Sequence, residues 1–265
     1  MGAIRPSAVA GTFYPADAGR LRAVVEDYLA AAEGSPAAGT PKAVIAPHAG
    51  YVYSGPVAGH AFGSLGEAAA AIRRAVVIGP AHFVPFRGIA LPNAEAFRTP
   101  LGDVPLDGHA TGAIRDLPQV HLADVPHQPE HALEVELPFL QMLLADFALV
   151  PLLVGDVMPE EVAQVLERLW RGPETLLVIS SDLSHYEAYE RARAHDAATA
   201  AAIERLEGVS LGPRDACGYL PIAGLLVEAG RRGMQAVRLD LRNSGDTAGG
   251  KDQVVGYGAW ALGEA

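Results

Sequence analysis

Apolar positions recur at helical spacing near the beginning of the chain and form short uninterrupted runs further on. Residues 16–33 carry leucine, valine and alanine at i, i+3, i+4 and i+8, which predicts an amphipathic helix that ends at Gly34. The runs at 43–46 and 74–79 are short and apolar with β-branched residues, which is typical of buried strands. Residues 55–65 between them predict a helix. This part of the chain is therefore predicted to form a βαβ unit.

Similar patterns continue to the end of the chain. Residues 130–144 predict a helix, with Pro138 marking a kink or a restart. Residues 84–129 are rich in Pro, Gly, Asp and His and predict loops and peripheral strands, such as the run at 88–91. The remaining predicted strands are 147–154, 175–179, 236–241 and 254–262, and the remaining predicted helices are 159–171, 187–206 and 214–232. We expect one α/β domain over residues 1–265, with a mixed, mainly parallel sheet and helices on both faces.

Composition and charge exclude several classes of protein. The formal net charge is -11, and Lys and Arg are scattered, so the chain lacks the basic surface that nucleic-acid binding needs. No apolar run approaches the roughly 20 residues that span a bilayer, and the N-terminal segment lacks the apolar core of a signal peptide. The single cysteine, Cys217, permits no intrachain disulfide. We expect a cytoplasmic protein without nucleic-acid or membrane partners.

Two histidines directly follow predicted strands. His48 comes after the strand at 43–46, and His82 comes after the strand at 74–79. Ligands bind at the carboxyl ends of parallel strands in open sheets, and imidazole nitrogen suits iron, zinc, copper and nickel. Taken singly, each histidine is equally well explained as a hydrogen-bonded structural residue. Their matching positions favour a metal site.

A third histidine, His185, lies in the segment SSDLSHY that follows the predicted strand at 175–179. Asp182 lies near enough in sequence to orient the His185 ring, and a loop histidine beside a capping aspartate is the structural alternative. Serine hydrolysis is disfavoured, because Ser180, Ser181 and His185 share one loop and no G-x-S-x-G motif is present.

Three further segments offer weaker candidates. Glu130, His131 and Glu134 have a spacing that suits metal binding or acid/base chemistry on one helix face, or equally a polar helix start. The turn at 243–247 places a carboxylate and hydroxyls between two strands, or forms an ordinary hairpin loop. Cys217 precedes an apolar helix whose N-terminus favours a thiolate, although a packed thiol is more common there.

Several motifs follow one another along nearly the whole chain. They are RP at 5–6, AGTFYP at 10–15, PHAGYVYSG at 47–55, GPAHF at 79–83, EHALEVELPFL at 130–140, SSDLSHY at 180–186, CGYLPI at 217–222 and the final VVGYGAWAL. In sequence and in order these motifs resemble those of the Memo family. The resemblance implies a fold similar to the class III extradiol dioxygenases of the LigB type, which hold non-haem iron(II) with two histidines and a carboxylate. It also implies protein partners among AMMECR1-like and radical-SAM proteins.

The resemblance assigns roles to individual residues. His48 and His82 match the two histidine ligands, and His185 matches a pocket histidine that acts in acid/base catalysis or beside the metal. Eukaryotic members have a cysteine at the last metal-facing position, where Thr247 is the best match here, so no thiolate is available. We therefore predict Asp246 as the carboxylate ligand, with Thr247 beside it.

The leading hypothesis is a non-haem, iron(II)-dependent oxidoreductase of dioxygenase type that acts on a small aromatic diol. Copper and zinc are the alternative metals. In this hypothesis His131, Asp182 and His185 are the candidate catalytic acids and bases. The other hypotheses are a binding or adaptor protein with a vestigial dioxygenase pocket, a metal carrier, and a Cys217-dependent transferase. The sequence leaves the choice between an enzyme and a binding protein open.

Overall fold

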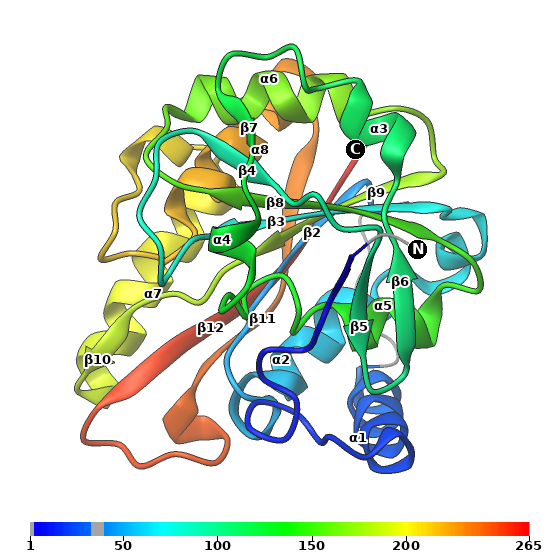
Figure 1. The fold of residues 1–265 in the computed structure, drawn as a ribbon. Coiled ribbons are helices and arrows are strands. Elements are labelled where there is room, and N and C mark those ends of the chain that lie inside the picture. Colours follow the sequence, from blue (N-terminus) through cyan, green and yellow to red (C-terminus); the bar gives the residue numbers. More distant parts are fainter. Residues whose placement is uncertain (1–2, 33–39, 265) are drawn as a thin grey trace.

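The computed structural model describes residues 3–32 and 40–264. Figure 1 shows the helices and strands in space. The helices are α1 (Ala18–Ala31), α2 (Tyr51–Gly63), α3 (Gly108–Gly112), α4 (Asp124–His127), α5 (Leu137–Leu143), α6 (Pro159–Leu169), α7 (Tyr189–Glu204) and α8 (Tyr219–Arg231). The strands are β1 (Ile4–Arg5), β2 (Ala43–Ala46), β3 (Arg74–Pro80), β4 (Ile89–Leu91), β5 (Ala96–Thr99), β6 (Gly102–Pro105), β7 (Val120–Leu122), β8 (Ala148–Val154), β9 (Thr175–Ser180), β10 (His185–Glu187), β11 (Gln235–Asn243) and β12 (Val254–Gly263).

One large mixed sheet carries the fold. Its strands run in the order β10-β12-β2-β9-β3-β8-β4-β7, and β11 pairs with β12. The central strands β2, β9, β3 and β8 are parallel, while β12 pairs antiparallel with β2 and β4 pairs antiparallel with β8. The central strands therefore end at one common edge, where the segments that contain His48, His82 and His185 begin. The mixed α/β sheet expected from the sequence is confirmed.

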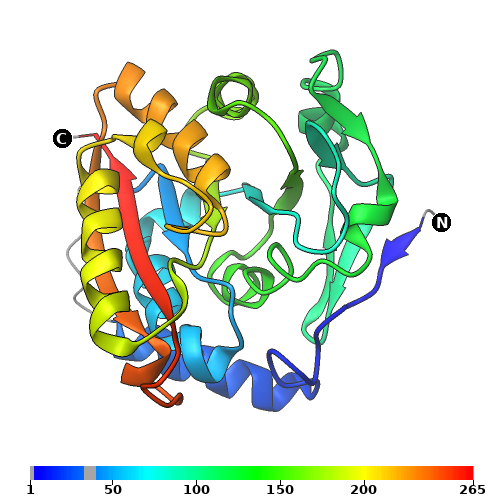
Figure 2. The ribbon, with the colours of Figure 1, turned by 90° about the vertical axis from the view of Figure 1, so that its left-hand side faces the viewer.

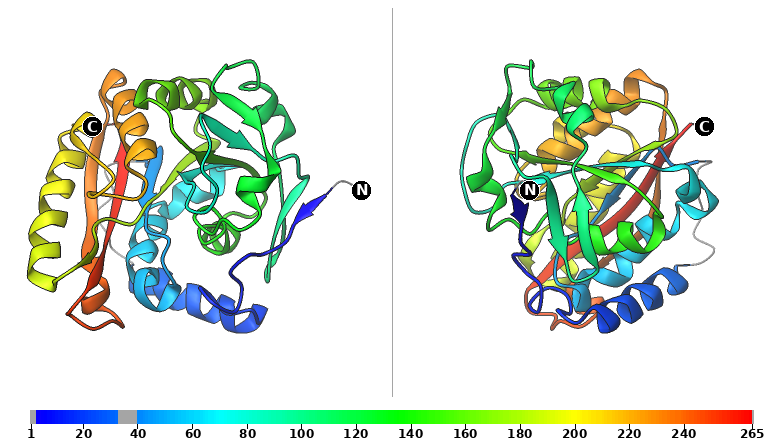
Figure 3. Two further views of the ribbon diagram at one scale, coloured as in Figure 1. Left: turned by 60° about the vertical axis from the view of Figure 1, so that its left-hand side comes forward. Right: turned by 45° about the vertical axis from the view of Figure 1, so that its right-hand side comes forward.

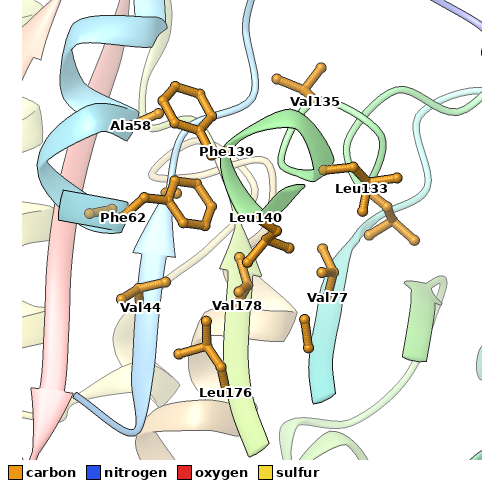
Figure 4. Close-up of a cluster of buried hydrophobic side chains, with 14 of the residues drawn as sticks. Val44, Ala58, Phe62, Val77, Leu133, Val135, Phe139, Leu140, Leu176 and Val178 are labelled. Carbon is orange, nitrogen blue, oxygen red and sulfur yellow. The ribbon is translucent and has the colours of Figure 1, made fainter. Parts of the chain in front are cut away.

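Helices cover both faces of this sheet, because alternate strand residues point to opposite sides. Val44, Val77 and Val178 are buried on the face covered by α2 and α5 (Figure 4), and α1 packs on these two helices. Their neighbours Ile45 and Ile78 are buried on the face covered by α6, α7 and α8. Figure 2 shows α7 along the hairpin of β11 and β12, and Figure 3 shows α1 beside α2. No helix in the described ranges is long and apolar enough to cross a membrane.

The predicted helix over 130–144 is wrong in its first half. Residues 132–136 form turns, and α5 begins only at Leu137. Pro138 explains this, because its ring would clash with the Glu134 carbonyl if the helix continued backwards. The restart predicted at Pro138 is therefore confirmed. Glu130 and Glu134 consequently do not share a helix face.

The middle of the chain contains more strand than its loop-rich sequence predicts. β4 and β7 extend the large sheet, whereas β1, β5 and β6 form a separate three-stranded sheet. The first predicted helix is present as α1, and Gly34, its predicted end, lies outside the described residues. The predicted helix over 55–65 begins earlier, at Tyr51, so that α2 follows His48 almost directly.

His127 makes the stability of this fold sensitive to acid. Its side chain is buried, its Nε2–H donates to the Ala90 carbonyl (3.0 Å), and its Nδ1 has no hydrogen-bond partner among the described residues. Burial lowers the pKa of His127 to about 4. Since a histidine in the unfolded chain titrates near pH 6.5, protons bind preferentially to the unfolded state as the pH falls from about 6.5 to about 4.

We expect His127→Gln to remove part of this acid sensitivity. The free energy of unfolding of the parent should fall by up to about 1.4 kcal/mol more per pH unit than that of the variant, between pH 6.5 and 4. Urea unfolding at a series of pH values measures both slopes. The control is His109→Gln, which replaces an exposed histidine and should keep the parental slope. Equal slopes for parent and His127→Gln would contradict the prediction.

Candidate metal centre

Three imidazoles meet at the carboxyl edge of the parallel strands. The possible ligand nitrogens of His48, His82 and His131 lie within 4.8 Å of one another. The ring centroids are 5.1 Å apart for His48 and His82, 5.4 Å for His48 and His131, and 4.8 Å for His82 and His131. His48 is buried, His131 is half-buried and His82 opens to solvent. The group can therefore bind an ion and remain reachable from outside.

Each of these histidines is brought to the edge by a different segment. His48 follows β2 and His82 follows β3, as the sequence predicts. His131 comes from the turns before α5, which pack closely on β3 at Gly79. A Cβ at Gly79 would lie 3.1 Å from a Leu133 methyl group and 3.3 Å from the Ala132 Cβ. The absence of a side chain at Gly79 thus lets the His131 segment approach the sheet.

Hydrogen bonds fix the orientation of two of the rings. The Ser180 hydroxyl donates its proton to the Ala132 carbonyl or the Glu136 carboxyl group. Its oxygen is therefore the acceptor for His48, whose Nδ1–H donates to Ser180 Oγ (2.7 Å). The His82 Nδ1–H donates to the Glu130 carboxylate (2.8 Å). In both histidines Nε2 keeps its lone pair. A metal-binding histidine is usually held in this way, by a partner on its other nitrogen.

Burial keeps His48 and His131 in the neutral form that binds metals. It is the main cause that lowers the pKa of His131 to about 4 and the pKa of His48 well below its usual value. His131 Nδ1 is buried and has no hydrogen-bond partner among the described residues, although it lies 3.3 Å from a Glu130 oxygen. Neutral imidazoles at His48 and His131, together with a polar atom without a partner, fit a divalent cation.

Glu130 holds two of the histidine segments together. Its carboxylate accepts hydrogen bonds from the ring and backbone of His82 and from the backbone N–H groups of His131 and Ala132. Burial raises the pKa of Glu130, but the hydrogen bonds from His82 outweigh burial and hold the pKa below its usual value. Glu130 is therefore a carboxylate that orients His82.

Replacing Glu130 with glutamine is expected to weaken the binding of a divalent metal ion at the three histidines by about 10- to 100-fold, the usual cost of losing such an outer partner. The amide keeps the size of the side chain but removes the charge that polarises His82. Calorimetric titration of metal-free protein measures the effect. Glu207→Gln, at an exposed position, is the control and should bind as the parent does. An unchanged affinity in Glu130→Gln would contradict this role.

Asp182 and His185 lie at the same edge but interact differently from the prediction. His185 Nδ1–H donates to the Leu183 carbonyl (2.8 Å) and not to the predicted partner, the Asp182 carboxylate. Asp182 Oδ1 instead accepts the backbone N–H of His48 (2.9 Å). Burial raises the pKa of Asp182 to about 7. Asp182 therefore holds the backbone of His48, and the idea that it orients the His185 ring is wrong.

The structure does not bring the other predicted ligands into the three-histidine group. His185 and Asp246 are not among the residues whose ligand atoms converge. The Asp246 carboxylate accepts hydrogen bonds from the Tyr189 hydroxyl and the Asn243 N–H. Thr247 Oγ1 donates to the Ser244 carbonyl (3.2 Å). In this structure the side chains of Asp246 and Thr247 stabilise the turn that joins β11 to β12.

Cys217 lies beside the histidines, as the hypothesis of a transferase that uses Cys217 and a pocket histidine requires. Its Sγ is 3.3 Å from His48 Nε2, and it accepts a hydrogen bond from the Asp182 N–H. Burial raises the pKa of Cys217 to about 12, with the Asp182 charge as the second cause. The thiol is therefore favoured over the thiolate, which opposes the transferase hypothesis.

The fold and the site define an α/β protein with a cluster of three histidines at the carboxyl edge of its parallel strands. The model of the Memo-like protein family matches residues 5–261. The chain belongs to this family. It is similar to a MEMO1 family protein of Aquifex aeolicus (34% identical, covering 96% of this chain and 97% of that protein). A MEMO1 family protein of Aeropyrum pernix is 36% identical, covering 97% of this chain and 98% of that protein.

His131 is the site residue that the sequence does not place beside His48 and His82. The sequence predicts a metal-binding or acid/base role for it with Glu130 and Glu134 on one helix face, or equally a polar helix start. The signal was its position next to Glu130, a carboxylate that bonds to His82 in the fold. The fold is needed to see this, because residues 82 and 130 are distant in sequence.

Proposed function

We propose that this protein is a non-haem metal-dependent oxidoreductase of dioxygenase type, with iron(II) as its metal and a LigB-type fold. The observation that carries the proposal is the convergence of His48, His82 and His131 within 4.8 Å. Imidazole ligands with an open solvent side suit iron(II) chemistry, in which substrate takes the free positions. Zinc and copper are the alternative metals.

In this proposal His48, His82 and His131 hold the metal. The metal, when bound, supplies the redox chemistry that lets molecular oxygen react with an aromatic diol. Ser180 and Glu130 hold the rings of His48 and His82 in the orientation that presents Nε2. His185 has its Nδ1–H bonded to Leu183, so its Nε2 is the atom that accepts a proton from the substrate hydroxyl.

The aromatic side chains around the histidines support a small aromatic substrate. The Phe13 ring lies 4.7 Å from the His131 ring, and the Phe83 ring lies 5.8 Å from it. Phe83 is 57% exposed, so its ring is available for contact. An exposed aromatic ring beside the three histidines favours contact with another planar ring.

An anaerobic titration of metal-free protein with iron(II), followed by calorimetry, tests this proposal. The parent is compared with a His48→Ala/His82→Ala double variant and with a His109→Ala/His121→Ala control, which removes two exposed histidines. We expect near-stoichiometric binding in the parent and the control, and its loss in the double variant. Oxygen uptake with catechol, measured on the loaded protein, then tests the reaction.

The possible outcomes separate the hypotheses. Iron-dependent oxygen uptake with catechol supports the oxidoreductase. Tight iron binding without oxygen uptake on catechols would replace it with a metal carrier or an adaptor that works with protein partners. Equal binding by the parent and the His48→Ala/His82→Ala variant would overturn the metal site itself.

A further inference from the structure

A mainly apolar cavity of about 310 Å³ lies at the carboxyl ends of β3 and β8 and the beginning of α8. Its volume is near the lower limit of small-molecule sites and about twice that of a cavity known to hold benzene. The apolar residues that line it are Pro80, Pro85, Phe86, Val154, Leu220 and Pro221. The cavity is thus large enough for one ring or a branched alkyl group.

This cavity adjoins the three histidines. Cys217 lines it, and the Cys217 Sγ is 3.3 Å from His48 Nε2. Ala81 also lines it and precedes His82 in the chain. A molecule bound at the histidines therefore has the apolar cavity directly beside it, with Cys217 between the two regions.

The charges of the lining restrict what enters. Among the described residues that line the cavity there is no lysine, arginine or histidine, so an anionic group has no cationic partner. The lining includes one carboxylate, Asp156, whose side chain is 81% exposed and lies 3.8 Å from the Arg87 guanidinium. Burying an anion here without a partner is costly, whereas burying an apolar group is favourable.

We propose that this cavity binds an uncharged apolar substituent of the substrate, while the polar reacting end lies against His48, His82 and His131. The inference rests on the proposed function for the reacting end. It adds the substrate class: a small metal-chelating molecule with an apolar group of one-ring size and no charge on that group. A phosphorylated or sulfonated substituent is disfavoured at this position, because the lining itself offers it no cationic partner.

Anaerobic calorimetry with three probes tests the inference. The probes are catechol, 4-tert-butylcatechol and 4-sulfocatechol, and each is titrated into metal-free and iron-loaded protein. We expect 4-tert-butylcatechol to bind at least about tenfold tighter than catechol, because its four additional carbons leave water. We expect 4-sulfocatechol to bind no tighter than catechol.

Two variants locate the preference. Leu220→Trp fills the cavity and should reduce the advantage of 4-tert-butylcatechol to less than about threefold. Leu117→Trp, which replaces a half-buried leucine outside the cavity, should keep the parental advantage. Iron(II) titration of both variants should give the parental affinity, which shows that they are folded and that the histidines are intact.

The comparison of probes distinguishes failure of this inference from failure of the proposed function. Equal affinities for catechol and 4-tert-butylcatechol, or a full advantage retained in Leu220→Trp, would overturn the cavity assignment even if iron binds. The cavity assignment is supported if metal-free protein prefers 4-tert-butylcatechol to catechol and Leu220→Trp removes this preference. That result would stand even if iron did not bind and the proposed function were wrong.

Discussion

His131→Ala is expected to weaken iron(II) binding by at least about 100-fold, while His185→Ala leaves the affinity within about threefold of the parent. Loss of an outer partner of a ligand already costs about 10- to 100-fold, so loss of a ligand costs at least as much. His131 belongs to the group of nitrogens that lie within 4.8 Å, and His185 does not. The resemblance of the sequence motifs favoured His185 beside the metal. The two variants therefore show whether the third ligand is His131, as the geometry indicates, or His185, as the motifs suggest.

Anaerobic calorimetry on metal-free protein measures both affinities. His121→Ala is the matched control, because it removes an exposed histidine and should bind iron as the parent does. Circular dichroism shows whether each variant is folded. The prediction is contradicted if His185→Ala loses iron(II) affinity strongly while His131→Ala keeps the parental affinity. The metal ligands would then be His48, His82 and His185, as the motifs suggest.

The contrast between His82 and His131 shows how far the sequence predicts this site. His48 and His82 were predictable because each directly follows a strand of the parallel centre, and adjacent parallel strands end at one edge. His131 has no such strand. Its position depends on turns that pack against Gly79 and on the Glu130 carboxylate, which bonds to His82 across the fold. Contacts of this kind leave no periodic pattern in the sequence.

The same distinction applies to the fold. The central strands were predicted because each is an apolar run bounded by Gly, Pro or polar residues, and such runs fix their own secondary structure. β1, β5 and β6 form a sheet that the sequence did not indicate, since β1 is two residues long and pairs with β5 far along the chain. Residues 132–136 form turns and not the predicted helix, because the ring of Pro138 prevents a helix from running through the residues before it.

The N-terminal segment is tied to the His131 turns by a buried ion pair between Arg5 and Glu134. The Arg5 side chain is 5% exposed and the Glu134 side chain is fully buried. Arg5 also donates to the carbonyls of His127 and Glu130, and Glu134 accepts the backbone N–H of Ala8. The pair therefore connects the beginning of the chain to the residues on either side of the metal site.

Glu134→Gln is expected to lower the free energy of unfolding by about 3 kcal/mol or more. The amide fills the same space but leaves the Arg5 guanidinium buried without a counter-charge, and breaking a buried pair on one side costs about 3–5 kcal/mol. Urea unfolding at pH 7 measures the loss. Asp103→Asn in the exposed pair with Arg98 is the control and should stay close to the parent, since exposed pairs contribute little.

The same variant also tests whether this buried pair positions the metal site. Glu134 lies three residues after His131, and its partner Arg5 donates to the Glu130 carbonyl. If the pair only stabilises the fold, folded Glu134→Gln binds iron(II) with the parental affinity. If it positions the turns, the affinity falls as well, and the stabilisation that saturating iron gives to the folded state becomes smaller than in the parent. We expect the second result, because Glu134 and its partner Arg5 hold the segment that contains both Glu130 and His131.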